Sequence, residues 1–252
     1  MTPRTPTAFG PSVSTVFGRE LFALFDSSIA YVACVAALLA TNAAFMNEFF
    51  LTGKLDMTPF FDRLPLVLVL FLPAIAMRAW SEDLRTRTFE LWMTLPMRPV
   101  SVVLGKFAAA LALYALFLCG TLPIVVMLAA LGSPDLGRIA AGYVGALFLG
   151  AQLLALGQLF SSLTRDQIVA FLGTAFGAFL LVFSGEERVV SVLDGLAPRW
   201  TLGTYVADFF SALPSYESFV RGELTLRAAT YFTAFAAAFL WMTTLAVERN
   251  RT

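Results

Sequence analysis

Residues 100–131 read VSVVLGKFAAALALYALFLCGTLPIVVMLAAL, a run of 32 residues in which Lys106 is the sole charge. A transmembrane helix needs about 20 mostly apolar residues, because the hydrocarbon core of a bilayer is about 30 Å thick. This run exceeds that length. It therefore predicts a membrane-spanning helix that starts outside the hydrocarbon.

Further apolar runs lie on both sides of this stretch. They predict five more membrane-spanning helices, at residues 28–50, 64–80, 139–163, 167–183 and 226–247. Pro65 and Pro73 lie within the second span and predict a kink there. Six spans place both termini on the same side of the membrane. The predicted fold is an all-α integral membrane protein, with residues 1–252 forming a single domain.

The composition excludes several other classes of protein. Hydrophobic residues make up 59% of the chain and charged residues 13%, whereas a typical soluble domain has about 25% charged residues. A soluble fold of this size would have too much apolar surface for its core, and a disordered chain would be far more polar. The 17 basic and 17 acidic residues cancel, so we expect membrane lipid and no nucleic acid as a partner.

The chain offers little for catalysis or ion coupling. It contains no histidine, which removes the commonest general base and metal ligand. Cys34 and Cys119 lie inside apolar runs, where a free thiol behaves as a small hydrophobic group. The middles of the six predicted spans carry no Asp, Glu, Lys or Arg. Glu48 and Lys106 lie near span ends, where we expect their long side chains to reach the interface. We therefore expect no enzyme, no metal site, no cofactor in this chain and no ion-coupled carrier.

The basic residues indicate the orientation of the spans. With both termini in the cytoplasm, ten of the Lys and Arg residues lie on the inner side and seven on the outer side. Inner loops carry the excess of Lys and Arg in most membrane proteins. We therefore predict a multi-pass protein whose two termini are cytoplasmic.

Residues 13–26 precede the first span and show one apolar helical face. That face consists of Val13, Val16, Phe17, Leu21, Leu24 and Phe25, and it is interrupted by Arg19, Glu20 and Asp26. The pattern predicts an amphipathic helix that lies in the membrane interface. The alternative is that this segment extends the first span.

Residues 81–98 join the second span to the third and combine a charged first half with an apolar second half. The apolar residues of the second half are Phe89, Leu91, Trp92, Met93 and Leu95. Thr88 is placed to cap a short helix that Pro96 would end. Two interpretations stay open from these residues alone: a helix that docks into a groove on another protein, and a helix that lies on lipid headgroups.

Three blocks of the sequence resemble permeases of the ABC-2 type, most closely the subgroup associated with gliding motility. The first block is Arg19-Glu20-Leu21 with Ser27-Ser28-Ile29-Ala30-Tyr31-Val32. The second is Trp80-x-Glu82, Thr88-x-Glu90-Leu91 and Thr94-Leu95-Pro96, followed by Val103-Leu104-Gly105-Lys106-Phe107. The third is Leu163-Thr164-Arg165-Asp166-Gln167-Ile168-Val169-Ala170-Phe171. The order and spacing of the blocks carry the resemblance, over about residues 17–183.

The resemblance implies the ABC-2 exporter fold. In that fold residues 13–26 are an elbow helix, and residues 184–225 form re-entrant outer helices between the fifth and sixth spans. It also implies a subunit of the bacterial inner membrane that pairs with a second permease half, identical or related, and with two copies of an ABC ATPase. An extracytoplasmic accessory subunit is left open. ATP and Mg²⁺ would be bound by the ATPase, because neither Gly53-Lys54 nor Gly105-Lys106 is followed by the Ser or Thr of a phosphate-binding loop.

The resemblance further implies that residues 86–96 are the coupling helix, seated in a cleft of the ATPase. The contact with the ATPase would be oriented by Glu82, Arg85, Arg87 and Glu90. The groove of the ATPase would be filled by Phe89, Trp92 and Leu95. Many family members have glycine at the position of Arg87, so a tight left-handed turn is not expected there.

Gly173 and Gly177 form a GxxxG pattern in the predicted fifth span. Such a pattern lets two helix backbones approach closely. The resemblance favours this span, together with the first, as a dimer interface, and packing inside one bundle is the alternative. A largely apolar lumen, lined by Phe45, Phe49, Phe176 and Phe179, would suit a lipid-linked or amphipathic substrate.

The expected function is therefore export of a substrate, driven by ATP hydrolysis on a separate subunit. The alternative is a membrane anchor or scaffold that recruits a cytoplasmic ATPase without transporting anything. Both share the segment at residues 81–98, and only a permease would make substrate cross a membrane.

Overall fold

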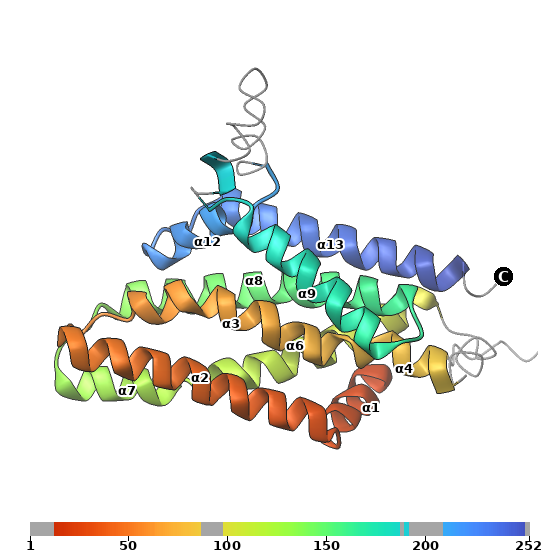
Figure 1. Cartoon of the computed structure of the whole chain (residues 1–252), viewed down its shortest axis with the longest axis horizontal. Helices are drawn as coiled ribbons and strands as arrows, with labels where there is room; N and C mark the ends of the chain where they lie inside the picture. Colours follow the sequence, from red (N-terminus) through yellow and green to blue (C-terminus); the bar gives the residue numbers. More distant parts are fainter. Residues whose placement is uncertain (1–12, 87–97, 187–188, 192–208, 250–252) are drawn as a thin grey trace, which may run out of the picture.

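The computed structural model describes residues 13–86, 98–186, 189–191 and 209–249, and this part of the chain contains helices and no strand. The long helices lie side by side in a bundle (Figure 1). In chain order the elements are α1 (Val13–Phe25), α2 (Ser28–Thr52), α3 (Thr58–Ala76), α4 (Arg78–Thr86), α6 (Pro99–Cys119), α7 (Leu122–Leu131), α8 (Leu136–Leu163), α9 (Gln167–Phe183), α12 (Leu213–Val220) and α13 (Leu226–Arg249).

Five helical stretches among the described residues are long and apolar enough to cross a membrane. They are α2, α3 with α4, α6 with α7, α8, and α13. α9 is apolar but shorter, at 17 residues, which corresponds to about 25 Å of helix against a hydrocarbon core of about 30 Å. The prediction of an all-helical, multi-pass membrane protein is confirmed for the described residues, and a sixth crossing stays a prediction.

Capping residues account for several helix ends. α9 has the bounds predicted for the fifth span, and the Asp166 carboxylate accepts a hydrogen bond from the Ile168 backbone N at 2.8 Å. α8 begins at Leu136, three residues before the predicted 139–163, because Asp135 caps it by accepting from the Arg138 backbone N at 3.1 Å. α2 ends at Gly53, which has the left-handed φ of 62° that favours glycine.

Two of the predicted spans differ from the helices that the structure contains. α3 begins at Thr58, ahead of the predicted start at residue 64. The predicted span starts after the charged Asp62 and Arg63, yet both belong to α3, and Arg63 Nη2 lies 2.6 Å from Glu48 Oε2 on α2. The predicted span 100–131 is two helices, because α6 ends at Cys119 and α7 starts with a proline in its first turn.

α8 is the central helix of the bundle. It packs against α3, α4, α6, α9, α12 and α13, and glycines on its different faces allow this. Gly142 lies against the ring of Phe61 on α3, and Gly150 lies against the ring of Tyr114 on α6. Tyr114 is fully buried and donates a hydrogen bond to the Ala146 carbonyl at 2.8 Å. The small residues of this span therefore serve packing inside one chain.

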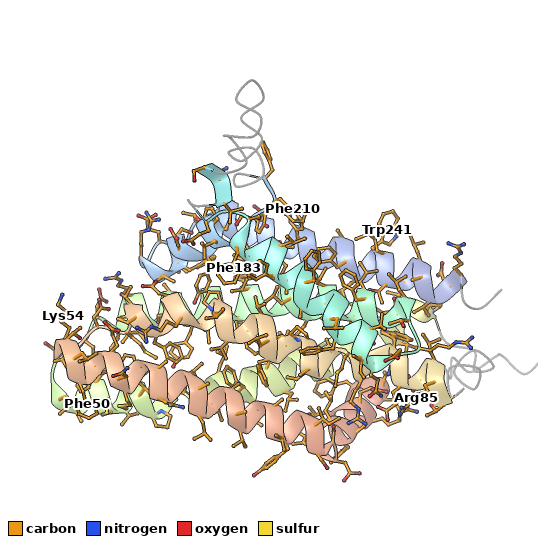
Figure 2. The ribbon with its side chains drawn as sticks, viewed as in Figure 1. Phe50, Lys54, Arg85, Phe183, Phe210 and Trp241 are labelled. Atoms are coloured by element: carbon orange, nitrogen blue, oxygen red, sulfur yellow. The ribbon has the colours of Figure 1, made fainter. Side chains whose placement is uncertain are left out.

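The described ends of the chain lie at the same end of the bundle, called here the α4 end. Val16 of α1 and Val247 of α13 belong to one apolar cluster with Trp80 of α4, and Figure 1 shows α4 and the end of α13 at the same end of the molecule. Figure 2 shows Arg85 at the α4 end and Lys54 at the opposite end.

The opposite end, called the α12 end, is held together by polar contacts of Arg138, in the first turn of α8, with the end of α12 and with the α2–α3 loop. Arg138 Nε donates to the Val220 carbonyl at 3.0 Å, and Arg138 Nη1 lies 4.0 Å from Asp56 Oδ2. Burial alone would raise the pKa of the Asp56 carboxyl, but hydrogen bonds from Thr58 and the charges of Arg138 and Lys54 hold that pKa below its usual value. This carboxylate therefore stays ionised at neutral pH and links the α2–α3 loop to the first turn of α8.

The contact between Gly150 and Tyr114 yields a first prediction. In the Gly150→Ala variant the new methyl group would overlap the Tyr114 ring, so we expect the free energy of unfolding to fall by about 1–3 kcal/mol. Gly18→Ala is the control, because a Cβ at Gly18 of α1 has no atom within 4 Å. Thermal unfolding in detergent would measure both variants. Equal melting temperatures for the two would contradict close packing of α6 on α8.

Candidate functional site

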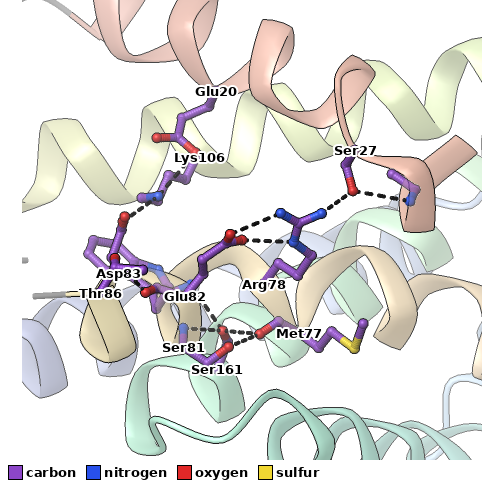
Figure 3. Close-up of polar contacts among 12 residues, drawn as sticks. Glu20, Ser27, Met77, Arg78, Ser81, Glu82, Asp83, Thr86, Lys106 and Ser161 are labelled. Carbon is purple, nitrogen blue, oxygen red and sulfur yellow. Dashed lines mark hydrogen bonds and ion pairs between the residues drawn. The ribbon is translucent and has the colours of Figure 1, made fainter. Parts of the chain in front are cut away.

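A cluster of charged and aromatic side chains lies where α1, α4 and α6 meet (Figure 3). The members, named here the junction cluster, are Glu20, Arg78, Trp80, Glu82, Asp83 and Lys106. Glu20 lies on α1, the predicted interfacial helix, and Lys106 lies on α6, in the predicted third span. The other four residues lie on α4, which leads into residues 87–97. The cluster lies directly before residues 87–97, which are outside the described residues.

Lys106 is the centre of the junction cluster. Its Nζ lies 3.0 Å from Glu20 Oε2 on α1 and 2.9 Å from Asp83 Oδ2 on α4. The side chain is only 4% exposed, and its Nζ lies 5.2 Å from the centroid of the Trp80 ring. A buried ammonium is tolerated where opposite charges and a π face replace its water. One buried cation therefore joins three helices.

A second set of contacts fixes α4 to the α1–α2 turn. Arg78 Nε and Nη2 donate to the two carboxylate oxygens of Glu82, at 2.7 and 3.0 Å. The same guanidinium donates to the Ser27 hydroxyl, which also accepts a hydrogen bond from the Ala30 backbone N at the start of α2. Arg78 thus connects the first turn of α4 with the cap of α2.

The joint between α3 and α4 is completed by a side chain from α8. The Ser161 hydroxyl accepts hydrogen bonds from the backbone N of Trp80 and of Ser81, both at 3.0 Å, and donates to the Met77 carbonyl at 2.8 Å. A hydroxyl that enters the backbone ladder at a bend is a known cause of helix kinks. The break between α3 and α4 at Met77 therefore involves Ser161, whereas Pro65 and Pro73, on which the predicted kink rests, lie inside α3.

α1 packs tightly on α6 beside the junction cluster. Val16 of α1 lies against Gly105, where an added Cβ would come within 2.6 Å of the valine side chain. Glycine at this position lets the two helix backbones approach closely, and the neighbouring Lys106 then reaches Glu20. Apolar packing and the ion pairs act on the same pair of helices.

The predicted coupling residues fall into two groups. Glu82 and Arg85 are described: Glu82 is engaged with Arg78 within the chain, and Arg85 is exposed on the last turn of α4. Arg87, Phe89, Glu90, Trp92 and Leu95 lie outside the described residues. A role for these seven residues in binding an ATPase stays a prediction.

Gly173 and Gly177 contact a side chain of their own chain. A Cβ at Gly173 would lie 2.9 Å from Phe160 Cδ1, and one at Gly177 would lie 3.0 Å from Phe160 Cε2. Phe160 belongs to α8, so both glycines take part in packing inside one bundle, the alternative that sequence analysis left open. Exposed side chains, including Leu172 and Phe176, occupy the other face of α9.

Sequence analysis missed the role of Lys106. We expected its side chain to reach the membrane interface; the structure shows that it is buried against Glu20 of α1 and Asp83 of α4, and its depth in the membrane stays a prediction. The available signal was a lysine in an apolar run, with acidic residues in the two segments that flank its span end. That pattern identifies the charged residues that need partners, but it does not predict which of them contact each other.

Three polar side chains inside the spans bond to the backbone of their own helices, whereas the amides of Gln152 and Gln158 on α8 are fully buried without a hydrogen-bond partner among the described residues. The hydroxyls of Thr41 and Thr174 and the amide of Asn42 donate to carbonyls of their own helices, at 2.6–3.1 Å. Within residues 13–86, 98–186, 189–191 and 209–249, no cluster of three metal-ligating side chains occurs.

No family model matches the sequence, and no curated protein matches it.

The junction cluster yields a second prediction. Lys106→Met would leave Glu20 and Asp83 facing each other without their buried cation, so we expect the free energy of unfolding to fall by about 3–5 kcal/mol. Arg221→Met is the matched control, because Arg221 pairs with Glu217 on an exposed face, at 2.9 Å, where such pairs contribute about 0.3–0.5 kcal/mol. Thermal unfolding in detergent would compare them.

A further variant separates charge from packing in this comparison. Glu20→Gln with Asp83→Asn in the Lys106→Met background removes the facing carboxylates, and we expect it to recover part of the lost stability. Similar losses for Lys106→Met and Arg221→Met, with no recovery, would contradict a structural role for the buried ion pairs.

Proposed function

We propose that this protein is the membrane-spanning permease subunit of an ABC-2 type ATP-binding cassette transporter and that it acts as an exporter. It would lie in the bacterial inner membrane with both termini in the cytoplasm. A second permease half and two copies of a separate ATPase, which binds ATP and Mg²⁺, would complete the transporter. The substrate would be lipid-linked or amphipathic.

One observation carries this proposal: the segment expected to dock with the ATPase follows a helix that is anchored to three others. α4 ends at Thr86, immediately before residues 87–97. Asp83 and Lys106 link α4 to α6, Arg78 and Ser27 link it to the α1–α2 turn, and Ser161 links it to α8. A pull on residues 86–96 would therefore displace several spans together.

The arrangement of the loops supports six crossings. The α8–α9 turn follows Ser161, which contacts the α3–α4 joint at the α4 end. The turn after α12 lies against Arg138 at the α12 end, where a Cβ at Gly222 would be 3.6 Å from Arg138 Cγ. Between these two turns the chain runs through α9 and α12, so that these two helices together provide the sixth crossing. α1 would be the elbow helix in the interface.

The mechanism follows from how α4 is anchored. ATP would close the two ATPase subunits, and each would displace the coupling segment docked on it. α4 would pass this movement to α1 and α6 through Lys106 and to α8 through Ser161. The spans would then shift against the second permease half and open a path for the substrate. Phe89, Trp92 and Leu95 would fill the ATPase groove, and Glu82, Arg85, Arg87 and Glu90 would orient it.

Trp92→Ala tests the docking role of the coupling segment. Loss of a buried aromatic at the centre of an interface costs about 2 kcal/mol or more, which is about 30-fold in Kd. We therefore expect weaker ATPase binding and loss of the coupling between ATP hydrolysis and transport in proteoliposomes. Trp241→Ala on α13 is the control, because Trp241 is likewise a large aromatic but is exposed on a spanning helix.

Three outcomes would contradict the proposal. ATP hydrolysis by the purified chain alone would remove the need for a separate ATPase. Unchanged coupling in Trp92→Ala would remove the docking role of that residue. An ATPase complex in which no lipid or amphiphile is ever moved across the membrane would favour the scaffold alternative.

Cysteine labelling tests the six crossings and their orientation. In a Cys34→Ala, Cys119→Ala background, we expect Arg85→Cys and Arg165→Cys to react with an impermeant maleimide from the cytoplasmic side. Lys54→Cys and Glu223→Cys should react from the opposite side. Labelling of Arg165→Cys and Glu223→Cys from one and the same side would show that the chain does not cross between them.

A further inference from the structure

A groove of about 490 Å³ lies between α2 and α6, with the end of α1 as its floor. Its walls include Tyr31, Cys34 and Leu38 from α2, Leu116 and Cys119 from α6, and Leu24 from α1. The Tyr31 hydroxyl is the only polar side-chain group among its lining residues apart from the two thiols. Its volume falls in the range of about 300–1,000 Å³ that is usual for ligand pockets.

The groove exists because α2 packs along α3 and comes close to α6 near Leu38. At the far end of the groove, Leu38 Cδ2 would lie 3.0 Å from a Cβ built on Gly120. At the near end, Leu24 and Phe25 of α1 close the space below. The groove therefore runs between α2 and α6, from the end of α1 to the level of Leu38 and Gly120.

The position of the groove determines what kind of molecule fills it. α2 and α6 with α7 are both apolar enough to cross a membrane, so the open side of the groove faces hydrocarbon. An empty apolar groove there would lose the van der Waals contacts of its walls. Water is a poor occupant, because a buried water needs two to four polar partners. A hydrocarbon chain would make van der Waals contacts with the groove walls and needs no polar partner.

The size of the groove excludes a helix as its occupant. A helix about 10 Å across would fill 490 Å³ over about 6 Å of its length, roughly one turn. A transmembrane helix from a second copy therefore does not fit inside the groove, and a second copy could only cover its open side. A flexible acyl chain of narrow cross-section can occupy the same volume along its whole length.

One end of the groove adjoins a charged crevice. The crevice, of about 70 Å³, shares Leu24 with the groove and is lined by Ser27, Arg78, Glu82 and Lys106 among others. The charged side chains of the crevice are paired within the chain, so the feature that matches the polarity of a phospholipid is an apolar groove with a polar crevice at one end. We propose that one phospholipid is bound here, with an acyl chain between α2 and α6 and its headgroup beside the α1–α2 turn. This site goes beyond the proposed function, since it is distinct from the coupling segment and requires no ATPase.

The bound phospholipid is distinguished from annular lipid by its slow exchange. Three helices surround it, so it leaves more slowly than lipid on a convex face. Its acyl chain fills the space that α2 and α6 leave between them, and its headgroup lies against the elements that carry the junction cluster. The lipid is therefore a structural part of the α1–α2–α6 corner.

Native mass spectrometry of the full chain in detergent tests this site. We expect one phospholipid to be retained per chain. Val35→Trp and Leu116→Trp enlarge groove-lining residues that are partly exposed, and we expect each to lower retention at least tenfold. Leu172→Trp is the matched control, because Leu172 is an exposed leucine on α9. Equal retention in all three variants would overturn the proposal.

Cysteine reactivity provides a measurement that needs no bulky substitution. Cys34 and Cys119, the only two cysteines of the chain, both line the groove. We expect their reaction with a membrane-permeant maleimide to be slow when phospholipid is present and faster after delipidation in detergent. Leu172→Cys in a Cys34→Ala, Cys119→Ala background should show no such change. This result supports the site even where a tryptophan variant fails to fold.

A second copy of the chain is the competing occupant. It would make the protection of Cys34 and Cys119 depend on protein concentration and not on added phospholipid, and a short bismaleimide would cross-link two copies through these thiols. Either result would overturn the lipid site. Neither would bear on the proposed transport function, which the Trp92→Ala variant tests separately.

Discussion

The rest of the structure depends on one constraint: a cation buried in an apolar bundle has to be neutralised by its own chain. Lys106 stands in the longest apolar run of the sequence and takes Glu20 and Asp83 as partners. Because the Lys106 side chain is buried away from water, its charge needs these partners, and α1 and α4 both meet α6 at this point. The position of α4, and with it the start of residues 87–97, follows from this requirement.

Much of the helical layout could be predicted from the sequence. Apolar runs identified the spanning helices, because a bilayer requires about 20 such residues per crossing. The bounds of α9 were predictable since Asp166 caps it and the apolar run ends with it. The start of α3 was not, because Asp62 and Arg63 mark the edge of the apolar run and not the edge of the helix. The helix break after Cys119 lies within a continuous apolar run, so hydropathy does not predict it.

The partners of small and charged residues were less predictable. A GxxxG pattern states that something approaches Gly173 and Gly177, and the structure supplies Phe160 from the preceding helix. In the same way, the sequence contains Glu20, Asp83 and Lys106 but not their pairing, which depends on the angle between α1 and α6. Close packing of Val16 on Gly105 brings these two helices together beside Lys106. Spacing along one helix therefore predicts a contact face, whereas the identity of the neighbour comes from the tertiary arrangement.

The serine at the bend between α3 and α4 has a mechanical consequence. Two amide groups that would otherwise close the ladder of a continuous helix are satisfied by a hydroxyl on α8. In an environment without water, backbone groups at a flexing point need such a substitute partner. The Ser161 hydroxyl therefore keeps both amides bonded at the joint, so the break between α3 and α4 depends on α8 lying beside it.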